Sequence, residues 1–293
     1  MRRMIVKLYV ILFGDLFNPF WKPRLQRRTR RYDIIERVFT KYLTRYIPQN
    51  VGIPREKKTK NEYIFSMWLQ GEKNAPPIVH ACWRSIKRNS GMKLIILDEN
   101  NLKEYLELPD FILRRRARGQ IGNAHFADII RVELLRKYGG VWMDSTLFMT
   151  GPIPEQIMSS NFFMFLANKN NAWGYGGVQN FFIRAKNNDY LINAWGEMIL
   201  SYWKNESRAM DYLVHQLMFN ALIKNDACAR DEFAKTLHIN LSPTHTIWPC
   251  HRDAPFDQQI FERAKKQTFV QKLSYHGTEN PIPGSFADKI KDM

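Results

Sequence analysis

Cysteine and acidic residues are both scarce in this chain of 293 residues. The three cysteines, Cys82, Cys228 and Cys250, lie far apart and form no Cys-x-x-Cys pair. This argues against a disulfide framework or a zinc finger and favours a reducing cytoplasm. Lys and Arg number 44 against 28 Asp and Glu, so the formal charge is +16. A surface of this charge attracts polyanions such as nucleic acid, anionic lipid or phosphorylated small molecules.

The apolar N-terminal stretch is short. Residues 4–13 cannot cross a bilayer, which requires about 20 residues, and they lack the small-residue cleavage site of a secretory signal. They form either a buried first strand or helix, or an interfacial anchor together with Phe17, Phe20, Trp21 and the basic residues 22–31. Aromatic rings beside Lys and Arg suit the headgroup region of an anionic membrane. The second alternative predicts a peripheral position on the inner face of the plasma membrane.

Residues 1–60 are expected to form a basic, aromatic and helical extension, and residues 61–293 the main domain. Hydrophobic residues make up 45% of the chain and aromatic residues 13%, which is enough to fill a sizeable core. Within the extension, apolar residues recur at helical spacing up to the helix-ending Pro48: Tyr32, Ile35, Phe39, Leu43 and Tyr46.

Short β-prone segments alternate with helical segments in the main domain. The expected strands are residues 63–69, 93–97, 141–143, 162–166 and 178–183, with 268–275 as a closing strand. The expected helices are residues 76–88, 99–106, 111–118, 125–138, 189–203 and 210–223. This alternation predicts an α/β fold with a mostly parallel sheet flanked by helices. Residues 178–183 are expected to pair with residues 162–166.

The stretch from residue 125 to residue 146 is the centre of this organisation. An amphipathic helix ends at Gly139 and Gly140, which let the chain reverse with positive φ. A short apolar strand then delivers Asp144 to its carboxyl end, where ligands bind in open α/β sheets. Asp128 and Arg131 stand three residues apart and therefore share one face of the helix.

The same residues carry a resemblance. The motif reads Ala127-Asp128-x-x-Arg131-x-x-Leu134-Leu135-x-x-Tyr138-Gly139-Gly140-Val141-Trp142-x-Asp144. It resembles the core of the sugar transferases that carry a DXD motif, which include yeast mannosyltransferases and clostridial glucosylating toxins. It is most similar to bacterial capsular polysaccharide synthesis proteins, through the further segments Trp68-x-Gln70-Gly71 and Asn180-Phe181-Phe182-Ile183-x-Ala185.

This resemblance covers roughly residues 63–275 and implies a nucleotide-diphosphate-binding fold of the GT-A type. It also implies a cytoplasmic glycosyltransferase that moves a sugar from a nucleotide-sugar donor, expected to be a UDP-sugar, with retention of configuration. The acceptor would be a hydroxyl of a growing surface glycan of the capsule or lipopolysaccharide type, including lipid-linked oligosaccharides. Nucleic acid is not an expected partner.

Asp144 is the acid that this resemblance places at the donor diphosphate. In the broader family a second acid two residues later binds a divalent cation, Mn²⁺ or Mg²⁺, but Thr146 stands there. Metal dependence therefore stays open, with Asp144 and His276 as candidate ligands and a surface histidine as the alternative for His276. Lys272 and Arg263 are alternative partners of the diphosphate.

The remaining candidate residues would bind the donor or act at its reacting carbon. Asp128 and Arg131 would hold sugar hydroxyls, or they form only a helical ion pair. Trp68 and Gln70 would line the nucleotide pocket, with core packing as the alternative for Trp68. Asp211 is either the N-cap of a helix or a group that stabilises the reacting carbon or attacks it, and His215, one turn later, shares this ambiguity.

Two other classes of function remain. A charge of +16 alone predicts a polyanion-binding protein, although no RRM, helix-turn-helix or zinc signature is present. Thr146 in place of the second acid would also suit a transferase-like scaffold that has lost catalysis.

Overall fold

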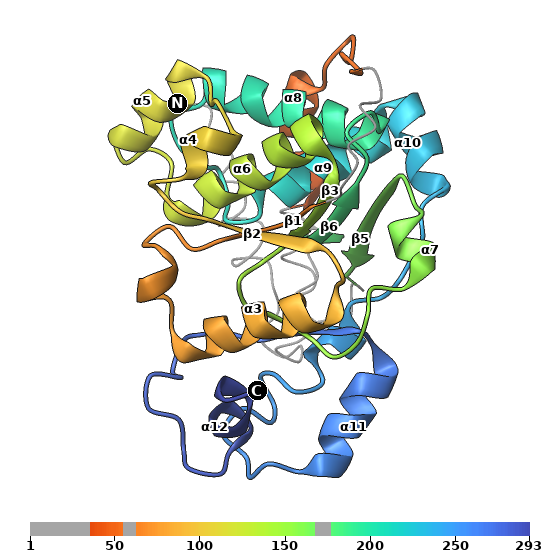
Figure 1. Ribbon diagram of the computed structural model, residues 1–293. Coiled ribbons are helices and arrows are strands. Elements are labelled where there is room, and N and C mark those ends of the chain that lie inside the picture. Colours follow the sequence, from red (N-terminus) through yellow and green to blue (C-terminus); the bar gives the residue numbers. More distant parts are fainter. Residues whose placement is uncertain (1–35, 55–62, 168–176) are drawn as a thin grey trace, which may run out of the picture.

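The computed structural model describes residues 36–54, 63–167 and 177–293. Within them a central sheet has helices on both faces (Figure 1). Its strands are β1 (Tyr63–Met67), β2 (Lys93–Leu97), β3 (Gly140–Met143), β5 (Phe162–Leu166) and β6 (Val178–Ala185), in the order β2-β1-β3-β6-β5. β1 pairs in parallel with β2 and β3, whereas β6 runs antiparallel to β3 and β5. Every strand except β6 therefore points the same way, and the predicted α/β fold of the GT-A type is confirmed.

Helices of two groups cover the sheet. One face carries α4 (Leu102–Tyr105), α5 (Asp110–Ala117), α6 (Asn123–Tyr138), α8 (Tyr190–Asn205), α9 (Val214–Asn225) and α10 (Ala227–Ala234) (Figure 1). The other face carries α3 (Pro77–Asn89), with α11 (Gln258–Gln267) and α12 (Phe286–Lys291) beyond it. The short helices are α7 (Glu155–Met158), η1 (Thr44–Tyr46), η2 (Glu72–Asn74) and η3 (Ser242–His245).

Alternating side chains on the strands build a separate core on each face. In β1, Ile64 packs in the cluster on the α3 side and Phe65 in the cluster on the α6 side. In β3, Val141 and Met143 face α3 while Trp142 faces α6. This period of two is that of a strand buried on both faces. The interiors of β1 and β3 are therefore mostly apolar, with Ser66 as a buried polar residue of β1.

A small second sheet lies next to the central one. It joins β4 (Leu147–Met149), which the sequence did not predict, to β7 (Val270–Lys272) in antiparallel register. β7 lies inside the predicted closing strand, and it pairs with β4 rather than with the central sheet. The helices α10, α11 and α12 were also not predicted.

The N-terminal extension is described only from residue 36. Residues 36–43 are helical and continue into η1, and Phe39, Leu43 and Tyr46 are buried in the core on the α6 side. The Tyr46 hydroxyl donates to Glu206 Oε1 at 2.6 Å. The candidate membrane anchor lies outside the described residues, and the division at residue 60 stays a prediction. In the described part of the chain, no helix is long and apolar enough to span a membrane.

Gly140 sets the distance between β3 and β1. Its φ is +99°, and a Cβ atom there would lie 2.5 Å from the carbonyl oxygen of Tyr63. A side chain at this position would therefore force apart the two strands that carry Asp144 and Trp68.

Gly140→Ala is expected to destabilise the protein more than an alanine with positive φ does when it has free space around it. Gly91 provides the control, because its φ is +66° and nothing lies within 4 Å of its added Cβ. Gly91→Ala should cost about 1–2 kcal/mol for the left-handed backbone, and Gly140→Ala about 1–3 kcal/mol more for overpacking. Urea unfolding of both variants measures the difference. Equal losses would mean that β3 can move away from β1 at no cost.

Candidate functional site

Asp144 stands at the carboxyl end of β3, as the sequence predicted. Its backbone N–H donates to the carbonyl oxygen of Phe181 on β6 at 2.8 Å, which fixes the turn that follows the strand. The Trp142 indole N–H donates to Asp144 Oδ1 at 3.0 Å. The carboxylate is thus held from its own strand and from the neighbouring one.

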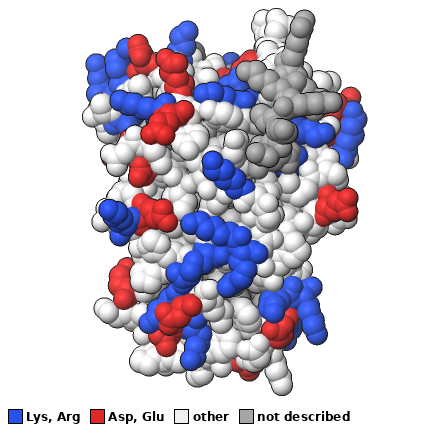
Figure 2. Space-filling model, in the orientation of Figure 1, with Lys and Arg blue, Asp and Glu red and all other residues white. Residues whose placement is uncertain are grey.

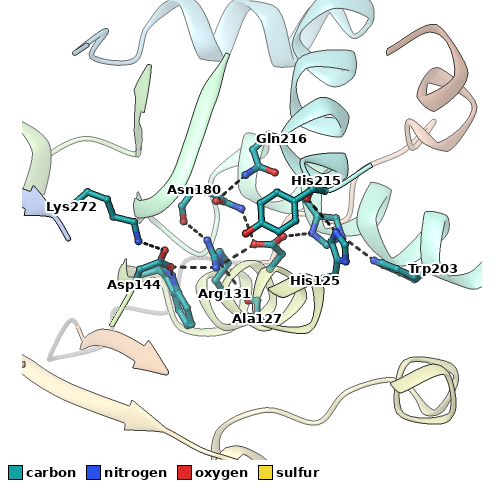
Figure 3. A network of polar contacts seen from close by, with 12 residues as sticks. His125, Ala127, Arg131, Asp144, Asn180, Trp203, His215, Gln216 and Lys272 are labelled. Carbon is teal, nitrogen blue, oxygen red and sulfur yellow. Dashed lines mark hydrogen bonds and ion pairs between the residues drawn. The ribbon is translucent and has the colours of Figure 1, made fainter. Parts of the chain in front are cut away.

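Helix α6 brings Asp128 and Arg131 to the same place. Arg131 Nη2 lies 3.2 Å from Asp128 Oδ1 and 3.3 Å from Asp144 Oδ1 (Figure 3). Arg131 Nη1 donates to the carbonyl oxygen of Asn180 at 2.6 Å, and the Asn180 amide donates to Asp128 Oδ1 at 2.8 Å. The predicted convergence of the acid after β3 with the pair on the preceding helix is therefore observed.

Lys272 completes this network from the C-terminal part of the chain. Its ammonium lies 3.0 Å from Asp144 Oδ2 and donates to Thr146 Oγ1 at 2.7 Å. Leu273 N–H donates to the carbonyl oxygen of Thr146 at 2.9 Å, so the second sheet holds Lys272 beside this threonine. Of the two basic residues suggested for the diphosphate, Lys272 is at the site, whereas Arg263 lies exposed on α11.

The two carboxylates of the network are ionised. Burial by itself raises the pKa of the Asp144 carboxyl, but Lys272 and Arg131 outweigh burial and hold this pKa below its usual range. Burial likewise opposes ionisation of Asp128, and Arg131 together with the hydrogen bond from His215 lowers the pKa of that carboxyl. Two carboxylates thus face two cations, which is the arrangement that makes buried charge tolerable.

His215 on α9 supports Asp128 from the far side. His215 Nδ1 lies 2.9 Å from Asp128 Oδ2, and the Trp203 indole N–H donates to His215 Nε2 at 2.9 Å. An indole can only donate, so Nε2 carries a lone pair and Nδ1 carries the proton. Burial lowers the pKa of this imidazole below its usual value, despite the Asp128 carboxylate, which raises it. His215 is therefore a neutral donor that orients Asp128.

The tautomer of His215 can be tested by its titration. The pKa of His215 is lower in the folded protein than its usual value of about 6.5. As the pH falls below about 6.5, the unfolded chain therefore binds a proton at His215 before the folded protein does, which lowers the free energy of unfolding. Above about pH 6.5 His215 has no such effect. We expect ¹⁵N–¹H spectra at pH 7 to show a neutral imidazole with its proton on Nδ1, assigned by the loss of the signal in His215→Gln. An imidazolium signal at pH 7 would contradict the network.

A pocket of about 730 Å³ opens beside Asp144 and Lys272. Its wall combines part of the network with residues of the C-terminal segment: Asp144, Thr146, Gln179, Asn180, Phe181, Tyr212, Leu213, Gln216, His245, Trp248, Pro249, Arg252, Lys272, Leu273, Ser274, Tyr275 and His276. Asp128 and Arg131 are buried and do not line this pocket, so their binding of sugar hydroxyls stays a prediction. The Gln216 amide donates to Asn180 Oδ1 at 3.0 Å, whereas its buried Oε1 and the buried Nε2 of Gln179 have no hydrogen-bond partner in the described part of the chain. Both atoms are shielded from solvent, so they are buried polar groups whose hydrogen bonds are not made within the described part of the chain.

The other predicted residues take different positions. His276 lines the pocket from an exposed position, with its ring 4.1 Å from that of Tyr275. Trp68 and Gln70 do not line the pocket. The Trp68 ring packs edge-on against Tyr275 at 5.0 Å, and Gln70 is exposed and accepts from Asn74 through its backbone carbonyl. Their roles, and that of His276 toward a metal, stay predictions.

Asp211 does not cap a helix, so that interpretation is wrong. α9 begins at Val214, and its N-cap residue Leu213 makes no side-chain capping bond. Asp211 Oδ1 instead accepts from the backbone N–H of Leu213 at 2.8 Å, the local turn that aspartate favours before a helix. A role of Asp211 at the reacting carbon stays a prediction.

Several residues of the site had no predicted role. Asn180 and Trp142 were recognised only as parts of the motif, and Gln179, Gln216 and Arg252 carried no signal of their own. Asn180 and Gln216 could have been suspected as polar residues within otherwise apolar buried segments, since such residues need partners.

Fold and site together define an α/β protein of the GT-A type with a charged pocket at the carboxyl end of its central strand. The chain belongs to the capsular polysaccharide synthesis protein family, whose sequence pattern matches residues 18–290. It is also similar to the O-glycosyltransferase braB of Annulohypoxylon truncatum, with 23% identity over 184 residues that cover 56% of this chain and 43% of the relative. The match thus spans less than half the length of this curated relative.

Proposed function

We propose that this protein is a glycosyltransferase that moves a sugar from a nucleotide-diphosphate donor to a hydroxyl of a growing surface glycan. The proposal is supported by the family and by the name of the similar O-glycosyltransferase. The observation that carries it is that Asp144 and Lys272 meet on the wall of one pocket, where the buried Arg131, paired with Asp128, also contacts Asp144. The resemblance in sequence favours a UDP-sugar donor and a capsular or lipopolysaccharide acceptor.

The chemistry of such a transfer needs positive charge at the leaving group. The bond from the anomeric carbon to the diphosphate oxygen breaks, and its electron pair goes to the diphosphate. The acceptor oxygen forms the new bond, and its proton goes to the departing diphosphate. Lys272 and Arg252 on the pocket wall supply cations for this charge. Retention of configuration stays an expectation from the resemblance, to be tested by the anomeric form of the product.

Hydroxyl groups of the sugar match the polar wall of the pocket. Gln216 Oε1 and Gln179 Nε2 have no partner in the described part of the chain and are shielded from solvent; if these side chains turn toward the pocket, the first can accept from a sugar hydroxyl and the second can donate to one. Binding a sugar there would satisfy two buried groups that otherwise cost free energy.

Nucleotide-sugar binding tests the proposal. UDP-, GDP- and CDP-sugars are added with and without Mn²⁺ in a thermal-shift screen, because a ligand that binds the native state raises the unfolding temperature. We expect one nucleotide class to stabilise the protein and mass spectrometry to detect slow hydrolysis of that donor. Binding without hydrolysis would favour an inactive scaffold. Saturable binding to RNA at physiological salt, with no response to any donor, would favour a polyanion-binding protein.

We also propose that the protein works on the inner face of the membrane, where lipid-linked acceptors lie. Arg84, Lys87 and Arg88 are exposed on α3, and Figure 2 shows Lys and Arg gathered in the middle of this face of the molecule. Co-sedimentation with anionic vesicles at low salt, but not with neutral vesicles, is the expected result. Equal recovery with both would contradict a charge-driven association.

A further inference from the structure

The Lys272 ammonium contacts both Asp144 and Thr146, the positions of the two acids in the Asp-x-Asp motif that the sequence resembles. A divalent ion at Asp144 needs a carboxylate oxygen that it can approach to about 2.0–2.6 Å. Asp144 Oδ1 already accepts from the Trp142 indole, and Oδ2 lies 3.0 Å from the ammonium of Lys272. The residue that would supply a second acid is Thr146, and its hydroxyl oxygen is 2.7 Å from the same ammonium.

These donors do not fit a divalent cation. An ion bound to Asp144 Oδ2 would lie next to a lysine ammonium, and the two like charges would repel each other. Within residues 36–54, 63–167 and 177–293, no group of three or more His, Cys, Asp and Glu side chains is arranged to hold a metal. His276 is on the same pocket wall, but it provides only one further nitrogen ligand.

We propose that the Lys272 ammonium replaces the divalent cation and binds the diphosphate of the donor, so that transfer requires no metal. This inference rests on the proposed function. An ammonium has three N–H donors. In the described part of the chain, Asp144 and Thr146 receive two of them, and the third is left for a phosphate oxygen in the pocket.

The surroundings of Lys272 suit this role. Its side chain is only 23% exposed and lines the pocket. The β4–β7 register places it opposite Leu147, directly after Thr146, and Asp144 fixes its ammonium from the other side. When the bond to the anomeric carbon breaks, the electron pair moves onto the diphosphate oxygen. Lys272 stabilises that charge by a hydrogen bond and keeps its own proton.

Calorimetry with UDP, GDP and CDP tests the inference. Each nucleotide is titrated into the full chain in EDTA and again in Mn²⁺, with wild type, Lys272→Met and Lys272→Arg. We expect one nucleotide to bind in EDTA with an affinity within about twofold of that in Mn²⁺. Lys272→Met should weaken binding about ten- to hundredfold, the contribution of a charge-assisted hydrogen bond, and Lys272→Arg should keep most of it.

Lys265→Met is the matched control. Lys265 lies 3.1 Å from Glu262 in an ion pair on α11, outside the pocket, so its loss should leave nucleotide affinity unchanged. Both substitutions remove a lysine from an ion pair, at Asp144 and at Glu262. Only the loss of Lys272 at Asp144 should change the nucleotide affinity. Circular dichroism shows whether each variant is folded.

The outcomes separate the two proposals. Nucleotide binding that requires Mn²⁺, whether or not Lys272→Met weakens it, would overturn the replacement of the metal by Lys272 and leave the transferase proposal standing. Binding in EDTA that Lys272→Met does not weaken would also overturn it. A protein that binds no nucleotide in either buffer, under conditions in which it is folded, would refute both proposals.

Discussion

Arg131→Met should destabilise the folded protein by about 3–5 kcal/mol, the cost of leaving buried charges without their partner. Arg131 Nη2 lies between the carboxylates of Asp128 and Asp144, at 3.2 and 3.3 Å. Its Nη1 also satisfies the carbonyl oxygen of Asn180 at 2.6 Å. Methionine fills similar volume without charge, so the two carboxylates would face each other and the carbonyl would lose its donor. Urea unfolding measures the loss.

A surface arginine provides the comparison for Arg131. Arg114 pairs with Asp110 at 3.7 Å on α5, with side-chain exposures of 64% and 85%. Arg114→Met should therefore change stability by less than about 1 kcal/mol. Adding Asp144→Asn to Arg131→Met should restore part of the lost stability, because one of the two uncompensated carboxylates disappears. A further loss in the double variant would show that repulsion between the carboxylates is not the cause.

Local signals explain why part of the site could be predicted from the sequence. The helix before Gly139 and the strand after it are adjacent in the chain, so the period of apolar residues and the paired glycines place Asp128, Arg131 and Asp144 together. The structure confirms these bounds closely, with α6 ending at Tyr138 and β3 ending at Met143. Within such a unit, the positions of side chains follow from helix and strand geometry.

Lys272 could be suggested from the sequence but not placed. Its contact with Asp144 joins residues 128 positions apart, and it depends on β7 pairing with β4. Each of these strands has only three residues, too few to show a period of two. The same limit applies to His215, because the sequence of α9 does not tell which of its polar residues turns toward α6.

Asp211 shows a different limit. An aspartate shortly before an apolar helical segment is the usual signal for an N-cap, and the same residue type also forms turns with the backbone two positions ahead. The two arrangements use the same carboxylate, and only the observed bond to Leu213 N–H decides between them.

Asp144→Asn should reduce sugar transfer by about a hundredfold or more, the scale of losing a main electrostatic group in an active site. An amide of the same shape keeps one oxygen acceptor but loses the negative charge. In the wild type, one carboxylate oxygen contacts Lys272 at 3.0 Å and the other accepts from Trp142 at 3.0 Å. The single amide oxygen can replace only one of these two interactions. The variant should remain folded by circular dichroism. Steady-state kinetics on the donor found in the binding screen measures the loss.

The control for Asp144→Asn is Asp110→Asn, which removes an exposed carboxylate on α5 and should leave transfer unchanged. A double variant then shows how Asp144 contributes to transfer. If Asp144 acts mainly by fixing Lys272, the double variant Asp144→Asn with Lys272→Met should lose little more activity than Lys272→Met alone, since residues that act as a unit are not additive. Multiplied losses would mean that Asp144 contacts the donor independently, and full activity in Asp144→Asn would show that this pocket is not the site of transfer.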